Sequence, residues 1–453
     1  MTKIFGTDGI RGFVNCEPLT AETCLKISKS VASLIKQNKY RNQRVVICKD
    51  TRLSGYLYEP LITAGFISMG IDVILVGPLP TPSLPLLIKT LRADLGVMIT
   101  ASHNTFEFNG LKFFNASGLK LDSKTEKKVE KIILNNNLYK KITNKIYKSG
   151  KAFRLEDASG RYSEYLKSVL NKHIEDKKNY KIVLDCANGA TYNVAPSIFW
   201  ELGHEVIPIH CNPNGKNINH NCGAVNVKDL IKNVISNKAD IGFAFDGDGD
   251  RLIVVDEKGL VVDGDKILAL FAKHYINKKN HKNKKIVIST VMSNLGFENY
   301  LKKDLKISLK RTKVGDINVI KEMNKNKSIL GGEQSGHIIL SEFSNTGDGI
   351  LAALKITEIM NQTNEKASQI FDLYEEYPQK KINISYKKNK KQIENKINNL
   401  AKKIKLSNKN FRTLIRFSGT EPLIRILVEG SDNNKVEFLA NKIKNEVRSI
   451  LDK

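Results

Sequence analysis

Three aspartates, Asp246, Asp248 and Asp250, occupy alternate positions and are separated by single glycines. Carboxylates at this spacing can turn toward one hard cation, because glycine adopts the backbone angles that such a tight loop requires. A calcium-binding loop would need glycine at its sixth position, where this chain has Arg251, and a helix afterwards, where the next residues are typical of a strand. The spacing therefore predicts a Mg²⁺ site that a phosphate oxygen or water completes.

A second stretch that could do chemistry is TASHN at residues 100–104. It follows residues 95–99, a short apolar run that predicts a buried strand. A hydroxyl such as that of Ser102 at the end of such a strand, with the imidazole of His103 beside it, is well placed for phosphoryl or acyl transfer. By itself a Ser-His pair in a loop is more often a simple turn, so its meaning depends on the other loops.

Further loops could bind anions or sugar hydroxyls. Residues 5–12 (FGTDGIRG) form a glycine-rich segment that could bring the guanidinium of Arg11 to a phosphate. Residues 331–337 (GGEQSGH) lie between two short apolar runs and could contact a sugar. Late in the chain, two arginines flank a Ser-Gly-Thr turn, which is typical of a phosphate cradle. The side chains and turn residues concerned are Glu333, Ser335 and His337, and then Arg416, Ser418, Gly419, Thr420 and Arg425.

The elements that must position these loops alternate between strands and helices. Helical periodicity marks residues 19–37 and 56–69, and the pattern restarts after Gly150. The expected strands include 44–48, 72–76, 95–99, 180–185, 205–209, 240–245 and 252–255. This alternation predicts layered α/β domains with largely parallel sheets, in which the strand ends are the natural place for a site.

The composition is that of an ordinary globular protein. The chain has 453 residues, of which 41% are hydrophobic, so three or four domains can each form a core. No run of about 18 apolar residues occurs and the first residues lack a secretory pattern, so we expect a cytoplasmic protein without a membrane partner. Six scattered cysteines suit reduced thiols better than a disulfide framework.

The net charge of +26 is the most unusual feature of the composition. Nucleic-acid binding through phosphate contacts is one explanation. The excess is mostly lysine, however, and it is spread along the chain beside abundant asparagine. The basic runs at 277–285 and 386–391 lack interleaved aromatic residues for base stacking. We therefore expect no specific nucleic-acid partner, although a basic field would attract an anionic sugar phosphate.

Cys211 and Cys222, with His210 and His220 beside them, raise the question of a zinc site. The paired spacing that is typical of zinc ligands is missing, and the Asn-Pro-Asn-Gly run between the cysteines predicts a turn. The sequence therefore favours a turn over a zinc site here.

Together, these stretches resemble the α-D-phosphohexomutase superfamily over the full chain, with the serine, aspartate, sugar and phosphate loops in the same order. The motifs that carry the resemblance are FGTDGIRG at 5–12, ITASHN at 99–104, LDCANGAT at 184–191, PNGKNIN at 213–219 with CGA at 222–224, DGDGDR at 246–251, RTKVGD at 311–316 and GGEQSGHI at 331–338. Gln334 in the sugar loop resembles the bacterial phosphoglucosamine mutase branch, since mannose and glucose mutases commonly carry Met there.

The resemblance implies three related layered α/β domains and a smaller α+β C-terminal domain around a central cleft. We place these domains at 1–150, with the serine loop, 151–251, ending in the metal loop, 252–366, with the sugar loop, and 367–453, with the phosphate loop. It also implies a phosphoserine at Ser102, whose phosphate joins the three aspartates on Mg²⁺. The implied reaction interconverts glucosamine 6-phosphate and glucosamine 1-phosphate through a 1,6-bisphosphate, feeding UDP-N-acetylglucosamine and cell-wall synthesis.

The resemblance also suggests roles for individual residues. Mg²⁺ and Arg251 would stabilise the transferring group, and Arg11, His103 and Lys112 are candidates for phosphate contact or proton transfer, with the general base left open. Glu333 and Ser335 would bind the sugar, with His337 in the same loop. The groups expected to hold the phosphate that is not transferred are Arg416, Ser418, Gly419, Thr420 and Arg425. A hexose 1,6-bisphosphate would act as primer, and a homodimer is compatible with the sequence.

Three positions depart from the family pattern. Thr105 stands where proline usually follows the serine loop, Phe108 where aspartate commonly precedes Asn-Gly, and Phe417 where the phosphate loop usually has proline. None of the changes removes a catalytic group. They affect the stiffness of the loops, because proline restricts the chain and threonine or phenylalanine does not.

Other functions compete with this interpretation. The nearest is a phosphomannomutase/phosphoglucomutase of the same superfamily. An RNA-binding protein would be favoured by the net charge, and a Mg²⁺-dependent phosphatase by the aspartate loop alone. Only the mutase interpretation uses all four loops.

Overall fold

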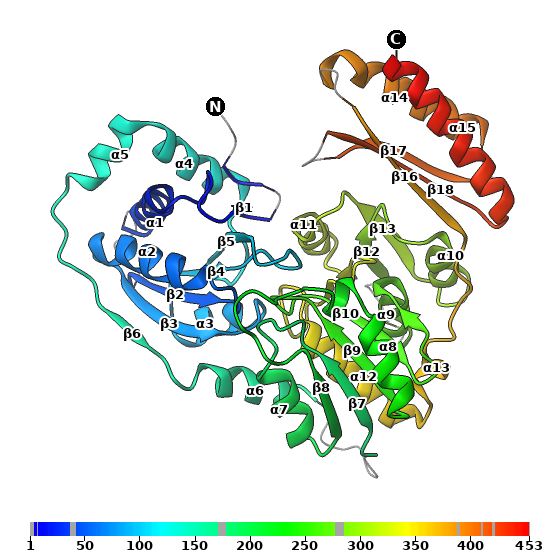
Figure 1. The fold of residues 1–453 in the computed structure, drawn as a ribbon, viewed down its shortest axis with the longest axis horizontal. Coiled ribbons are helices and arrows are strands. Elements are labelled where there is room, and N and C mark those ends of the chain that lie inside the picture. Colours follow the sequence, from blue (N-terminus) through cyan, green and yellow to red (C-terminus); the bar gives the residue numbers. More distant parts are fainter. Residues whose placement is uncertain are drawn as a thin grey trace. The chain divides into compact units, whose positions relative to one another are not determined.

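The computed structural model describes residues 4–6, 8–36, 42–170, 178–276, 285–386, 390–408, 411–418 and 422–452. The chain divides into two compact units (Figure 1). Unit 1 comprises Met1–Val291 and Leu309–Asp372, and unit 2 comprises Met292–Ser308 and Leu373–Lys453. No described helix is long and apolar enough to cross a membrane.

The first sheet of unit 1 has the strand order β1-β5-β4-β2-β3-β6. Its strands are β1 (Ile10–Phe13), β2 (Arg44–Lys49), β3 (Asp72–Pro78), β4 (Leu95–Ile99), β5 (Phe108–Asn115) and β6 (Ala152–Arg154). β2 runs parallel to β3 and β4, whereas β5 is antiparallel to β4 and β1. The expected strand at 95–99 is confirmed, and it delivers Ser102 at its carboxyl end.

Two parts of this sheet differ from what their local sequence suggests. Residues 10–12, which end the glycine-rich segment 5–12, lie in β1, and Asn109-Gly110, a dipeptide typical of turns, lies inside β5. Glycine is needed at position 110 because a Cβ atom there would come within 2.5 Å of the carbonyl oxygen of Ile10 and 2.6 Å of that of Thr100. The close approach of three backbone segments, rather than a reversal of the chain, therefore explains this glycine.

Helices around the first sheet enclose its core. They are α1 (Ala21–Lys36), α2 (Gly55–Ser68), α3 (Ser83–Thr90), α4 (Ser123–Leu134) and α5 (Asn136–Thr143). The Thr20 hydroxyl accepts a hydrogen bond from the Thr23 N–H, as expected for an N-cap. Apolar residues of α1 and α2, such as Val31 and Phe66, pack with Val45 and Val97 of the central strands in one buried cluster. This core holds the carboxyl ends of β2 and β4 in place.

The second sheet has the order β11-β10-β9-β7-β8. Its strands are β7 (Lys181–Asp185), β8 (Glu205–Ile209), β9 (Ile241–Phe245), β10 (Leu252–Asp256) and β11 (Val261–Val262), and the helices before and between them are α6 (Ala158–Ser168), α7 (Val194–Glu201) and α8 (Lys228–Ser236). β7 is parallel to β8 and β9, and β10 returns antiparallel to β9. The strand predicted at 252–255, which we placed at the start of the third domain, corresponds to β10 and pairs within the second sheet.

The third sheet has the order β13-β12-β14-β15. It contains β12 (Ile286–Thr290), β13 (Ser308–Thr312), β14 (Leu330–Gly332) and β15 (Ile338–Leu340), together with helices α9 (Gly264–Phe271), α11 (Asp316–Asn326), α12 (Gly349–Thr363) and α13 (Ala367–Ile370). β14 and β15 pair antiparallel, so residues 333–337 form the connection of a hairpin. Asp263 caps α9 by accepting from the N–H groups of Asp265 and Lys266.

Unit 2 contains an antiparallel sheet with the order β16-β18-β17. Its elements are α10 (Leu295–Lys303), β16 (Gln379–Ser385), α14 (Lys390–Ser407), β17 (Arg412–Phe417), β18 (Leu423–Glu429) and α15 (Asn433–Asp452). Residues such as Ile397, Ile426 and Val436 form a separate hydrophobic core between the sheet and its helices. Because α10 shares this unit, part of the chain ahead of the C-terminal region packs with it.

Candidate active site

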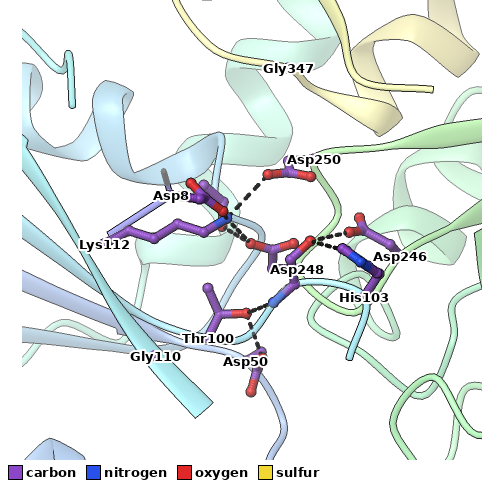
Figure 2. A network of polar contacts seen from close by, with 12 residues as sticks. Asp8, Asp50, Thr100, His103, Gly110, Lys112, Asp246, Asp248, Asp250 and Gly347 are labelled. Carbon is purple, nitrogen blue, oxygen red and sulfur yellow. Dashed lines mark hydrogen bonds and ion pairs between the residues drawn. The ribbon is translucent and has the colours of Figure 1, made fainter. Parts of the chain in front are cut away.

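Ser102 lies in the loop after β4 and is 1% exposed. Its hydroxyl donates to a carboxylate oxygen of Asp246 at 2.7 Å and lies 3.3 Å from Nδ1 of His103 (Figure 2). Its backbone N–H donates to the Thr100 hydroxyl, and its φ of +52° is in the left-handed region. A serine in this uncommon conformation, hydrogen-bonded to a carboxylate, is held in one orientation.

Asp246, Asp248 and Asp250 occupy the connection between β9 and β10, at the carboxyl end of β9. All three are buried, and one oxygen from each lies within 4.8 Å of the others. Burial, followed by the charges of Asp250 and Asp248, raises the pKa of Asp246 well above its usual range. Oδ1 of Asp248 is buried without a hydrogen-bond partner among the described residues. Converging buried carboxylates with an unpaired oxygen fit a divalent cation.

Lys112 supplies positive charge to the same loop. It extends from β5, is 1% exposed, and places Nζ 2.8 Å from Asp248, 3.3 Å from Asp250 and 3.3 Å from Asp8 (Figure 2). Burial opposes the charged form, but these carboxylates raise the pKa of Lys112 well above its usual value. Lys112 therefore remains an ammonium, which partly neutralises the three aspartates.

Three other predicted residues flank the serine and the aspartates. Arg11 projects from β1 and pairs with Asp8 at 3.0 Å. Nε of Arg251 lies 3.9 Å from oxygens of both Asp246 and Asp250. Burial, and then the positive charges of Arg251 and Arg11, lower the pKa of His103 to about 4. The imidazole is therefore neutral near pH 7, and the same surroundings make it a weak base.

The residues of the predicted sugar loop differ in their burial and in their contacts. Glu333 is 8% exposed and accepts from the Gly315 N–H at 2.9 Å, whereas Ser335 is exposed. His337 is buried: Nδ1 lies 3.5 Å from Asp250, and Nε2 accepts from the N–H of Gly347. These contacts favour a role for His337 in holding the aspartate loop rather than a contact with the sugar.

A buried arginine that we did not predict organises the serine loop. Arg52 donates to the carbonyl oxygens of Ser102, Asn104, Thr105 and Phe108, and its Nε donates to Asp50. Asp50 also accepts from the Thr100 hydroxyl, which holds the Ser102 N–H. The only sequence signal was a charged Asp-Thr-Arg run directly after a buried strand.

Asn219, in the segment that follows β8, contacts the same loop. Its amide nitrogen donates to the carbonyl oxygens of Ser102 at 2.9 Å and Asn104 at 2.8 Å. Thr81 likewise donates to a carboxylate oxygen of Asp248 at 2.7 Å. Long-range polar contacts therefore connect the serine loop and the aspartate loop to elements that carry none of the predicted catalytic groups.

The phosphate loop belongs to unit 2. Arg416 on β17 is paired directly with Arg425 on β18, so two guanidinium groups share one region of the sheet. Burial, and then the charge of Arg425, lower the pKa of Arg416. Ser418 follows β17, and Gly419 and Thr420 lie outside the described residues. Paired like charges in a hairpin are suited to binding an anion.

The order of the folded domains and of the predicted loops along the chain matches one protein family. Family profiles for phosphoglucomutase/phosphomannomutase match alpha/beta/alpha domain I at residues 2–140, domain II at 161–259, domain III at 263–377 and the C-terminal domain at 380–446. The chain therefore belongs to the phosphoglucomutase/phosphomannomutase family.

Individual relatives show which members of the family resemble this chain in sequence. The phosphoglucosamine mutase of Parvibaculum lavamentivorans is 44% identical over 445 residues and 97% of each chain. The phosphoglucosamine mutase of Zymomonas mobilis is 45% identical over 447 residues, covering 98% of this chain and 99% of the relative. Among solved structures, a phosphoglucomutase/phosphomannomutase family protein from Burkholderia thailandensis has a TM-score of 0.82 at 21% identity, covering 99% of this chain and 97% of its own. That likeness concerns the fold alone.

Proposed function

We propose that this protein is a phosphoglucosamine mutase, which interconverts glucosamine 6-phosphate and glucosamine 1-phosphate through a phosphoserine and a 1,6-bisphosphate intermediate. The observation that carries the proposal is the buried Ser102 hydroxyl, 2.7 Å from Asp246 in a three-aspartate loop. Relatives at 44–45% identity over nearly the whole chain carry the phosphoglucosamine mutase name. Gln334, which resembles the glucosamine branch, favours this sugar over mannose or glucose.

Asp246, Asp248 and Asp250 are the proposed ligands of Mg²⁺, and a phosphate on Ser102 would complete the set. An all-oxygen donor set of this kind suits Mg²⁺ better than a thiophilic metal. When bound, the ion would supply electrostatic stabilisation of the transferring phosphoryl group. The buried, unpaired oxygen of Asp248 supports this assignment.

In the proposed reaction, the bond between the Ser102 oxygen and phosphorus breaks as a sugar hydroxyl oxygen forms a bond to the same phosphorus. The proton of that hydroxyl passes to a base, and the serine later receives the other phosphate of the bisphosphate. Lys112 holds its proton, which supports an electrostatic role for it, and His103 stays a candidate proton acceptor because its neutral ring lies 3.3 Å from the Ser102 hydroxyl. Arg251 and Arg11 would contact the phosphate.

Substrate binding is assigned to two loops. Glu333 and Ser335 would contact the sugar hydroxyls. In unit 2 the arginine pair would hold the phosphate that is not transferred, together with Ser418, Gly419 and Thr420. We also propose the domain boundaries 1–150, 151–251, 252–366 and 367–453. A hexose 1,6-bisphosphate would act as primer. The protein would form a homodimer, and light scattering would test this oligomeric state.

The decisive experiment follows phosphate on Ser102. The protein with Mg²⁺ and glucose 1,6-bisphosphate should convert glucosamine 6-phosphate, and peptide mapping should find one added phosphate, about 80 Da, on the Ser102 peptide. Ser102→Ala should fold normally and lose both the label and most turnover, while Ser236→Ala, an exposed control, should keep them. Full activity in Ser102→Ala would remove Ser102 from the reaction.

Sugar preference is tested separately. Comparing kcat/KM on glucosamine, glucose and mannose phosphates should favour glucosamine, and a preference for mannose or glucose would assign the alternative phosphomannomutase/phosphoglucomutase activity. Release of inorganic phosphate at the rate of turnover would point to a phosphatase instead.

A further inference from the structure

A second cluster of metal-ligating side chains lies outside the residues assigned to the mutase reaction. Asp185 ends β7, His210 follows the adjacent parallel strand β8, and Cys222 precedes a short helical turn at Gly223–Val225. One ligand atom from each lies within 4.8 Å of the others. Asp185 and Cys222 are fully buried, and the His210 side chain is 25% exposed. An oxygen, a nitrogen and a sulfur therefore meet at one point beside the second sheet.

The contact between His210 and Asp185 is short, and it is the main reason that the pKa of His210 is raised above its usual value. Nδ1 of His210 lies 3.1 Å from Oδ1 of Asp185, yet this buried nitrogen has no hydrogen-bond partner with acceptable geometry among the described residues. Two ligands of a tetrahedral Zn²⁺, each bonded at about 2.1 Å, lie roughly 3.4 Å apart. The spacing of the two atoms is therefore close to that of a pair that shares a cation.

The other side of the imidazole is also suited to a metal ligand. Nε2 of His210 lies 3.3 Å from Oδ2 of Asp229. A metal ion on Nδ1 requires the neutral tautomer with its proton on Nε2, where the Asp229 carboxylate can accept that proton. Metal-binding histidines commonly have such a carboxylate partner, because it fixes the ring orientation and raises the basicity of the ligand nitrogen.

We propose that Asp185, His210 and Cys222 bind a thiophilic divalent cation, with Zn²⁺ as the ion that best suits a mixed oxygen, nitrogen and sulfur donor set. A thiolate ligand distinguishes this site from the all-oxygen aspartate loop. Binding converts the Cys222 thiol to a thiolate and leaves Nδ1 of His210 unprotonated, so the protons of both groups are released to the solvent. The sequence disfavoured zinc here because it offers no paired spacing; the fold brings in Asp185, which is distant from His210 and Cys222 in the chain.

A cation at this point would brace the segment that supports the serine loop. Asp185 accepts from the N–H groups of Ala187 and Gly223, and the carbonyl oxygen of Ala187 accepts from the N–H of Asn219. The Asn219 side chain in turn donates to the carbonyl oxygen of Ser102. The proposed ion would therefore be structural, holding the ends of β7 and β8 and the segment that presents Asn219.

The test uses Co²⁺ as a spectroscopic substitute for Zn²⁺ in the full-length protein, with excess Mg²⁺ present to occupy the aspartate loop. Co²⁺ bound to Cys222 should give an intense thiolate-to-metal charge-transfer band, which oxygen ligands cannot produce. The protein should also retain one Zn²⁺ per chain after gel filtration. Cys222→Ala and His210→Gln should each lose the band and the retained Zn²⁺.

Matched controls keep the test specific. Cys24→Ala removes another fully buried thiol, and His220→Gln removes an exposed imidazole of the same segment; both should keep the band. Because Cys222→Ala could misfold, His210→Gln provides an independent variant at a partly exposed position. Absence of the band in the wild-type protein, or its persistence in His210→Gln, would overturn the proposal and leave His210 as an imidazolium between two carboxylates.

Discussion

At the scale of single residues, charge balance decides how the aspartate loop is held. Three buried carboxylates cannot all be ionised together without compensating positive charge. Lys112, itself almost fully buried, supplies part of that charge through contacts with Asp248 and Asp250. A divalent cation would supply the remainder, so the lysine and the ion act on the same carboxylates.

Replacing this lysine should therefore make the protein more dependent on metal. Lys112→Gln should lower the stability of the metal-free protein by about 3–5 kcal/mol, the usual cost of breaking a buried ion pair. Mg²⁺ should then raise the Tm of the variant by more than it raises the Tm of the wild type. Thermal unfolding with and without Mg²⁺ measures this difference.

Lys120→Gln is the matched control, because Lys120 is also nearly buried and contacts Asp8 and Asp316 but none of the three aspartates. Its response to Mg²⁺ should equal that of the wild type. Equal Mg²⁺ responses in Lys112→Gln and the wild type would contradict the idea that lysine and metal share these carboxylates.

At the scale of elements, the sequence predicted where strands occur better than it predicted which distant residues contact one another. The apolar run at 95–99 identified β4, and the strand expected at 205–209 agrees with β8 in both bounds. Asn109-Gly110, although typical of a turn, lies inside β5, because the crowding that requires glycine comes from Ile10 and Thr100, far away in the sequence. Arg52 was missed for the same reason, since its four carbonyl partners belong to a loop some fifty positions later.

Arg52 acts as a positioning residue for the serine loop, which lacks the proline usual in this family. Arg52→Lys keeps the charge but cannot donate to four carbonyl groups at once. Because a displacement of about 1 Å can cost roughly 100-fold in rate, kcat should fall at least about tenfold while KM changes little. Steady-state kinetics on both parameters measures the split.

Arg154→Lys, at a side chain that is 47% exposed, is the control and should behave like the wild type. An Arg52→Lys variant with higher KM and unchanged kcat would mean that Arg52 acts on substrate binding rather than on the serine loop.

The start of α12 contains a pH-sensitive carboxylate. Asp348 is buried, accepts from Tyr162 and caps the helix by accepting from the Leu351 N–H. Burial raises the pKa of Asp348 from 3.8 to about 6. Because the folded-state pKa is the higher one, this group's contribution to stability is complete below about pH 4 and is lost as the pH rises through about 6.

Asp348→Asn keeps a capping oxygen but removes the titration. The free energy of unfolding of the variant relative to the wild type should therefore increase from pH 4 to pH 7, by up to about 3 kcal/mol. Urea unfolding at several pH values tests the slope. Asp122→Asn, at an exposed cap whose hydrogen bond to the Thr125 N–H lowers its pKa, should show no such increase between pH 4 and pH 7, because the contribution of Asp122 changes only below about pH 4. A pH-independent difference for Asp348→Asn would contradict the assignment.

At the scale of the whole molecule, the order of motifs indicated the family, but the division into units followed tertiary contacts. The sequence and the family profile for domain III both place residues 292–308 in the third domain, and these residues pack with the C-terminal sheet in unit 2. Fully buried Glu429 explains part of this association: it accepts from the Leu295 N–H at the start of α10, from Gln379 and from Arg412. No local pattern in residues 292–308 shows that their partner is a glutamate near the other end of the chain.

Glu429 should therefore control the stability of one unit and not of the other. Because each unit has its own hydrophobic core, calorimetry should resolve two transitions. Glu429→Ala leaves the Arg412 charge and the Leu295 N–H without their buried partner, so it should weaken unit 2 by about 3–5 kcal/mol and lower only its transition. Glu437→Ala, which breaks an exposed pair with Lys380, should change neither. If Glu429→Ala lowers both transitions equally, the two units unfold as one, and the separation seen in the contacts carries no thermodynamic meaning.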